Sequence, residues 1–127
     1  GHLGLTPQSM HQLGGYKVQG RTDGDLILEA AKALEAAGAF AIVLELVPAE
    51  LAARITAELK IPTVGIGAGV NCDAQVLVWT DLMGITKNPP KLAKAYRNLR
   101  KEMMDATKEW ADDVAASRFP GAEQSFK

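Results

Sequence analysis

The sequence has very little cysteine, and this absence excludes one class of protein at once. Cys72 is the single cysteine among 127 residues, so no disulfide bond can form within the chain. An isolated thiol fits a reducing compartment, and we expect a cytoplasmic protein. No apolar stretch approaches the roughly 20 residues that a membrane-spanning helix needs, and no signal peptide is recognisable. A disulfide-stabilised secreted domain is therefore not expected.

An excess of charge of one sign is also missing. The chain carries 14 basic and 15 acidic side chains, for a net charge of −1. This balance gives no electrostatic reason to expect nucleic acid or an anionic membrane as a partner. The content of 47% hydrophobic and 23% charged residues is ordinary for a globular protein, and the length indicates one domain or a piece of one.

Apolar segments typical of buried strands alternate with helical patterns along the chain. Strands are expected at residues 39–47, 61–69 and 74–82, and helices at 23–37, from Pro48 onward and at about 90–116. Such an alternation predicts an α/β fold with a parallel sheet, either open and doubly wound or closed into a barrel. The link at 70–74 is too short for a crossover helix. Either a turn replaces the helix there, or one of the strands is misplaced.

Glu45 is the one charged residue in the apolar run from Ala39 to Val47. It lies near the carboxyl end of its predicted strand, where α/β folds place catalytic groups. Burial favours the neutral form of a carboxylate and so suits it to act as a general base near neutral pH. The alternatives are a structural Glu paired with a Lys or Arg, or a carboxylate partly exposed at the end of the strand. Position alone leaves these readings open.

Other polar residues are weaker candidates for chemistry. His2 precedes a turn-rich stretch and could end a strand, and His11 has even less local support. The glycine-rich residues 14–21 carry Lys17 and Arg21. This segment could be a mobile cover, an anion clamp or a plain surface loop.

Several features further along the chain are each open to a functional and a structural interpretation. The glycines of residues 65–69 permit close backbone approach, but they lack the spacing of a dinucleotide-binding loop. Asp73 and Asp81 could bind a metal or cap a helix. No His or Cys spacing specifies a zinc site, and Cys72 has no base beside it in the sequence.

Six segments together resemble one family, the ketopantoate hydroxymethyltransferases. They are, in order, "GHLGLTPQS", "GGYKVQGR", "AIVLELVPAELA", "IPTVGIGAG", "QVLVWTDLMGI" and "FPGAEQSF", and they span nearly the whole chain. The resemblance implies a (β/α)₈ TIM barrel. Because such a barrel needs about 250 residues, residues 1–127 would be about its carboxyl-terminal half, with a last helix at about 90–116.

The resemblance also implies a reaction and the groups that serve it. The family transfers a hydroxymethyl group from 5,10-methylenetetrahydrofolate to 3-methyl-2-oxobutanoate, which gives 2-dehydropantoate in pantothenate synthesis. It requires Mg²⁺, which would stabilise the enolate, and it forms homo-oligomers, typically decamers. No segment here resembles the magnesium-binding aspartates, so the ligands are expected in the missing amino-terminal half, and this chain alone is expected to be inactive.

By the same resemblance, Glu45 is the general base that removes the proton beside the keto group, and His2 contacts the substrate. Thr80 stands where the family usually has His, and Ala74 where Gly is common. Two alternatives remain. One is a metal-dependent barrel enzyme of the phosphoenolpyruvate mutase and isocitrate lyase kind, and the other is a half-barrel without catalytic activity.

Overall fold

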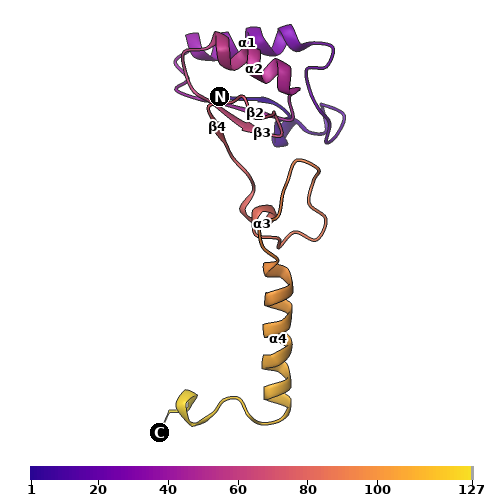
Figure 1. Ribbon diagram of the computed structural model, residues 1–127, viewed down its shortest axis with the longest axis vertical. Coiled ribbons are helices and arrows are strands. Elements are labelled where there is room, and N and C mark those ends of the chain that lie inside the picture. Colours follow the sequence, from indigo (N-terminus) through magenta and orange to yellow (C-terminus); the bar gives the residue numbers. More distant parts are fainter. Residues whose placement is uncertain (127) are drawn as a thin grey trace. The chain divides into compact units, whose positions relative to one another are not determined.

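A parallel sheet organises the amino-terminal part of the chain in the computed structural model, which describes residues 1–126 (Figure 1). The four strands, in the order β1-β2-β3-β4, are β1 (His2–Gly4), β2 (Ile42–Glu45), β3 (Thr63–Ile66) and β4 (Ala74–Gln75). Every neighbouring pair is parallel. Helix α1 (Gly24–Ala36) connects β1 to β2, and helix α2 (Ala49–Glu58) connects β2 to β3. The expected α/β class with a parallel sheet is therefore confirmed.

The chain divides into two compact units. We call Gly1–Leu77 the sheet unit, and the part from Val78 onward the helical unit. The helical unit contains α3 (Trp79–Leu82) and α4 (Leu99–Ala115). Single turns of 3-10 helix occur at Pro7–Ser9 and Ala122–Gln124. Among residues 1–126, no helix has the length and apolar content needed to cross a bilayer.

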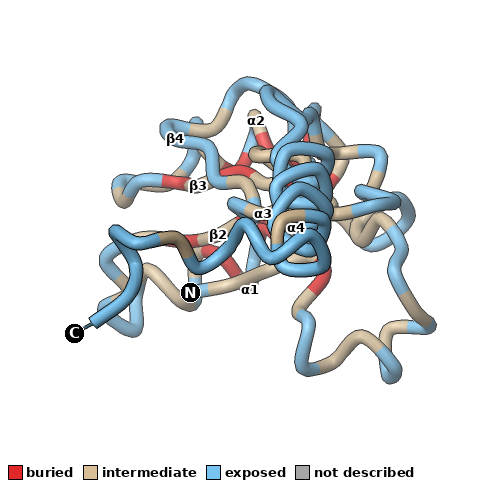
Figure 2. The backbone as a smooth tube through the Cα atoms, turned by 90° about the horizontal axis from the view of Figure 1, so that it is seen from below, coloured by how far each residue is buried: buried red, intermediate tan, exposed pale blue. Residues whose placement is uncertain are grey.

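The core of the sheet unit lies between the sheet and helices α1 and α2, which share one side of the sheet (Figure 1). Both helices are rich in alanine and leucine, and Gly38 follows α1 with φ of +93°. The buried residues include Leu28 and Ala31 from α1, Ile42 and Leu44 from β2, and Leu51, Ala52 and Ile55 from α2. Each fully buried leucine or isoleucine contributes about 1.5–3 kcal/mol. Figure 2 shows that most buried positions belong to the sheet unit, whereas α4 has no buried residue.

A polar network joins the starts of β3 and β4. The Thr63 N–H and hydroxyl donate to Asp73 Oδ2 at 2.8 and 3.1 Å, and the Asp73 N–H donates to Thr63 Oγ1 at 3.3 Å. Thr63 is fully buried and also contacts Thr56 Oγ1 at 2.8 Å. The network closes the short link between the two strands, so a turn takes the place of a crossover helix there.

We expect Asp73→Ala to lower the free energy of unfolding by about 1–3 kcal/mol, because the buried Thr63 N–H loses its acceptor. Urea unfolding followed by circular dichroism measures the change. The matched control is Asp23→Ala, which removes an exposed carboxylate that caps no backbone N–H of α1, and it should shift the midpoint far less. Equal midpoints for the two variants would contradict the structural role of Asp73.

The third predicted strand is wrong over most of its length. Strand β4 covers Ala74–Gln75 only, and residues 79–82 of the predicted strand form α3 instead. The apolar run suggested burial on both faces, but Val76 and Val78 are 47% and 51% exposed. Without a covering layer among the described residues, their hydrophobicity does not hold them in the sheet.

The last helix also begins later than the sequence pattern predicts. It starts at Leu99, not near residue 90, and ends at Ala115. Asn98 caps it, with its side chain accepting from the Lys101 N–H at 3.2 Å. Pro89 and Pro90 restrict the preceding backbone, which the 3.6-residue periodicity does not register. The charged face carries the i,i+4 ion pairs Lys101–Asp105 and Lys108–Asp112, as expected for a solvated face.

Candidate functional site

Glu45 and His2 come together at the carboxyl end of β2. His2 Nε2 lies 3.1 Å from Glu45 Oε2, although the two residues are 43 positions apart in the sequence. The Glu45 side chain is 12% exposed and that of His2 34% exposed. Among the described residues, His2 is the ion-pair partner of Glu45, and no Lys or Arg pairs with this carboxylate. The pair is a carboxylate held by an imidazole at the edge of solvent.

Parallel register explains how β1 brings His2 to this position. His2 lies opposite Val43, and Gly4 lies opposite Glu45. The approach at Gly4 is very close: a Cβ there would lie 2.1 Å from the Glu45 carbonyl oxygen, and φ at Gly4 is +86°. Only glycine fits this backbone, and it lets β1 run against β2 beside the site.

The site lies on the sheet face that α1 and α2 leave uncovered. Ile42 and Leu44 point into the core under the helices, and both are fully buried. Side chains alternate along a strand, so Val43 and Glu45 point to the opposite face. Both are partly buried, as are their β3 neighbours in the register, Val64 and Ile66. The carboxylate of Glu45 thus stands at the end of an apolar strip.

A separate cavity of about 580 Å³ opens at the starts of α1 and α2. Arg21, Asp25, Glu50 and Arg54 are among the residues that line it, and Glu45 is not. Arg54 forms ion pairs with Asp25 and Glu58, and the hydrogen bond to Asp25 raises the pKa of its guanidinium. The cavity is therefore a charged surface feature beside the loops that follow β1 and β2.

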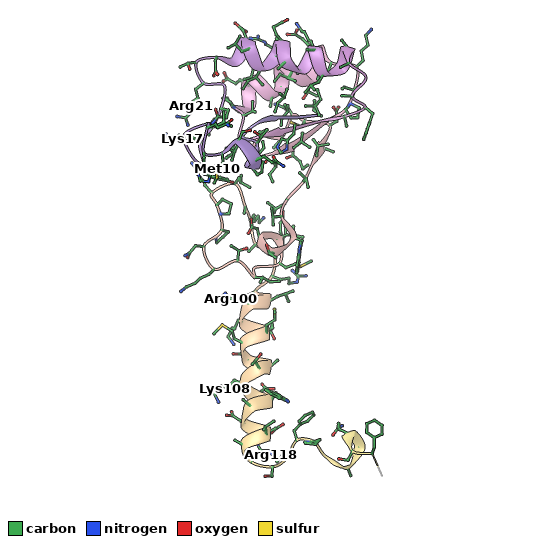
Figure 3. All side chains as sticks on the ribbon, turned by 180° about the vertical axis from the view of Figure 1, so that it is seen from behind. Met10, Lys17, Arg21, Arg100, Lys108 and Arg118 are labelled. Atoms are coloured by element: carbon green, nitrogen blue, oxygen red, sulfur yellow. The ribbon has the colours of Figure 1, made fainter. Side chains whose placement is uncertain are left out.

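The glycine-rich segment is attached to the strand end that carries Glu45. The Gln19 N–H donates to the Leu46 carbonyl at 2.9 Å. Lys17 and Arg21, at the two sides of Gln19, are both exposed (Figure 3). The structure thus places this segment beside Glu45 without bringing either cationic side chain into contact with the carboxylate.

The remaining candidates lie elsewhere. His11 is exposed, and Cys72 is partly buried close to Gly65. Asp73 binds the start of β3, at the opposite end of the strands from Glu45, so its role is structural. Asp81 is 6% exposed in α3 of the helical unit.

Thr80, the residue that departs from the family pattern, also belongs to α3. It accepts a hydrogen bond from the Thr86 hydroxyl at 3.3 Å.

The described residues do not form a metal site of their own. Across residues 1–126, no three His, Cys, Asp or Glu side chains lie together in a way that could hold a cation. Glu45 and His2 are only two potential ligands, and they are bonded to each other. These residues therefore do not by themselves fit the magnesium ion that the resemblance implies.

Two positions at the site could not be recognised from sequence alone. Gly4 shows its role only when β2 lies against it. Leu46 has a positive φ of 49°, a conformation that leucine rarely adopts, and nothing in the letters around it signals this. A glycine or asparagine at that position would have been the usual signal.

Comparisons with known proteins point to one family. A family model described as ketopantoate hydroxymethyltransferase matches residues 1–122. A curated 3-methyl-2-oxobutanoate hydroxymethyltransferase from Acidothermus cellulolyticus is 60% identical over 127 residues, which cover 98% of this chain and 47% of that protein. Proteins of the same name from Frankia alni and Kosmotoga olearia are 56% and 53% identical, and the chain covers 42% and 49% of them.

The chain thus spans about half the length of the curated relatives that it matches. The match nevertheless extends over nearly all of the chain itself, and it includes the strand of Glu45 and the strand of His2. On this evidence the expected family is confirmed over the alternative mutase and lyase kind: the chain belongs to the ketopantoate hydroxymethyltransferase family.

Proposed function

We propose that this chain provides the general base for transfer of a hydroxymethyl group from 5,10-methylenetetrahydrofolate to 3-methyl-2-oxobutanoate, which yields 2-dehydropantoate. One observation carries the proposal: the largely buried Glu45 carboxylate stands at the carboxyl end of β2 and is hydrogen-bonded to His2. A carboxylate held in this way is suited to remove a proton from the carbon beside a keto group.

The chemistry assigned to this chain is one proton transfer and its support. Glu45 takes the proton from C3 of the keto acid, and the electron pair of the broken C–H bond passes into the enolate. That carbon then forms the new C–C bond to the one-carbon unit, whose two C–N bonds to the folate are replaced by this bond and by a hydroxyl group from water, so that tetrahydrofolate leaves. His2, whose Nε2 touches the same carboxylate oxygen, directs Glu45 and contacts the substrate next to it. The apolar strip of Val43, Val64 and Ile66 limits access of water.

The sheet unit suits a piece of a closed barrel. Helices cover only one of its faces, as on the outside of a barrel, and the Glu45 face is left for an interior. The outer edges of β1 and β4 have no partner strand among the described residues. We infer that the amino-terminal half of a (β/α)₈ barrel pairs with these edges, carries the Mg²⁺ ligands and completes a cytoplasmic homo-oligomer, typically a decamer.

A full-length hybrid tests this function. In the Acidothermus cellulolyticus relative, the matching 47% is replaced by residues 1–127 of this chain, so that the rest of that protein supplies the missing part. We expect the purified hybrid to form 2-dehydropantoate at a rate comparable to that of the relative, measured with Mg²⁺ and 5,10-methylenetetrahydrofolate present.

The unmodified relative serves as the positive control, and circular dichroism checks that the hybrid is folded. A folded hybrid that assembles like the relative yet forms no product would support the non-catalytic half-barrel instead.

A further inference from the structure

The residue directly after Glu45 has an unusual backbone. Leu46 adopts φ of +49°, in the left-handed region, and Ser117 at +55° is the other non-glycine residue in that region within residues 1–126. A side chain beyond Cβ makes this region costly, and such residues persist where surrounding contacts hold them. An outlier of this kind beside a candidate base is a reason to ask what it does.

Hydrogen bonds hold the peptides on both sides of Leu46. Its N–H donates to the Ile66 carbonyl of β3 at 2.9 Å, and its own carbonyl accepts from the Gln19 N–H at 2.9 Å. The Glu45 carbonyl accepts from the Leu5 N–H at 2.8 Å. Three separate parts of the chain therefore fix the backbone on which the Glu45 side chain is mounted.

We propose that Leu46 is a positioning residue for Glu45, and this inference rests on the proposed function. Its left-handed backbone ends β2 abruptly, and the bonds to Ile66 and Gln19 keep it in that state. The turn stops Glu45 from relaxing along an extended strand, and it keeps the carboxylate at 3.1 Å from His2. Leu46 touches no reacting atom and acts through Glu45.

A leucine serves this purpose better than a glycine would. Glycine also reaches positive φ, but it explores both sides of the φ/ψ map. The Cβ of leucine confines the left-handed state to one narrow well. The restricted φ and ψ of Leu46 thus limit the orientations available to the Glu45 carboxylate. The glycine-rich segment, through Gln19, takes part in holding it.

The test uses the full-length hybrid defined above and measures deuterium exchange at C3 of 3-methyl-2-oxobutanoate without folate. We expect Leu46→Gly to remain folded, because relief of the left-handed strain offsets part of the entropy that glycine adds to the unfolded chain, and circular dichroism verifies this. Its kcat for exchange should fall about tenfold with KM nearly unchanged, since a displacement of about 1 Å in a catalytic group can cost up to 10²-fold. Leu46→Asn retains a Cβ and tolerates positive φ, so it should keep most of the exchange.

Ser117→Gly is the matched control, because it relieves the same kind of backbone in the helical unit. It should leave exchange at the parent level. Leu46→Gly with parent kcat, or with a loss confined to KM, overturns the positioning role, as does equal loss in the Gly and Asn variants. If the parent hybrid itself shows no exchange, the proposed function fails, and this result is distinct from a failure of the Leu46 inference.

Discussion

Replacing Glu45 with glutamine in the full-length hybrid should abolish deuterium exchange at C3 of 3-methyl-2-oxobutanoate. The amide of glutamine nearly matches the shape of the carboxylate but cannot accept the proton. General bases contribute typically about 10²–10⁴-fold to such steps, so the remaining exchange should lie near the background rate. Proton NMR in D₂O follows the loss of the C3 signal directly and requires no folate.

Two measurements separate a lost base from a lost fold. Glu45→Gln should bind Mg²⁺ and the keto acid as the parent hybrid does, because the rest of the site is unchanged. Glu29→Gln is the matched control, since Glu29 lies on α1 with a side chain that is 69% exposed. It should exchange at the parent rate. Retained exchange in Glu45→Gln would remove Glu45 from the role of base.

The isolated chain should show negligible hydroxymethyl transfer, even with Mg²⁺ and 5,10-methylenetetrahydrofolate in excess. Two structural observations support this expectation. The described residues hold no cluster of three potential metal ligands, and the edges of β1 and β4 have no strand partner among them. An exposed parallel edge also favours aggregation over a defined site. The hybrid should therefore transfer the hydroxymethyl group at a measurable rate, and the isolated chain should not.

The comparison needs a pure chain. Intact mass spectrometry verifies that the sample is one polypeptide of 127 residues without a second fragment. Product formation is then followed under the same conditions as for the hybrid. Robust turnover by the verified chain alone would refute the half-barrel account, because every group the reaction needs would then lie within these residues.

Glu45 could be identified from the sequence because its signal, an acid with apolar neighbours, lies within one short segment. One acid among eight apolar residues in the run 39–47 stands out in any fold that buries the run. His2 had no comparable signal. Its role depends on a partner 43 positions away, and only the parallel register of β1 with β2 brings the two side chains within 3.1 Å.

The two errors in secondary structure have separate causes. Residues 76–78 carry an apolar pattern suited to a strand, but Val76 and Val78 are about half exposed, without a covering layer among the described residues. Residues 90–98 carry an apolar pattern suited to a helix, but Pro89 and Pro90 restrict the backbone before α4, which starts at Leu99. Periodicity reports the faces that a segment could bury. It does not report whether a neighbour exists to bury them.

Local order alone was enough to indicate the α/β class, the helices at α1 and α2, the strands at β2 and β3, and the acid at the end of β2. These features follow from the spacing of apolar residues within each segment, which spans only a few positions. The contact of Glu45 with His2, the need for Gly4 and the left-handed Leu46 emerged only from the assembled sheet. They depend on contacts between segments that are distant in the sequence. No single segment contains both partners of such a contact.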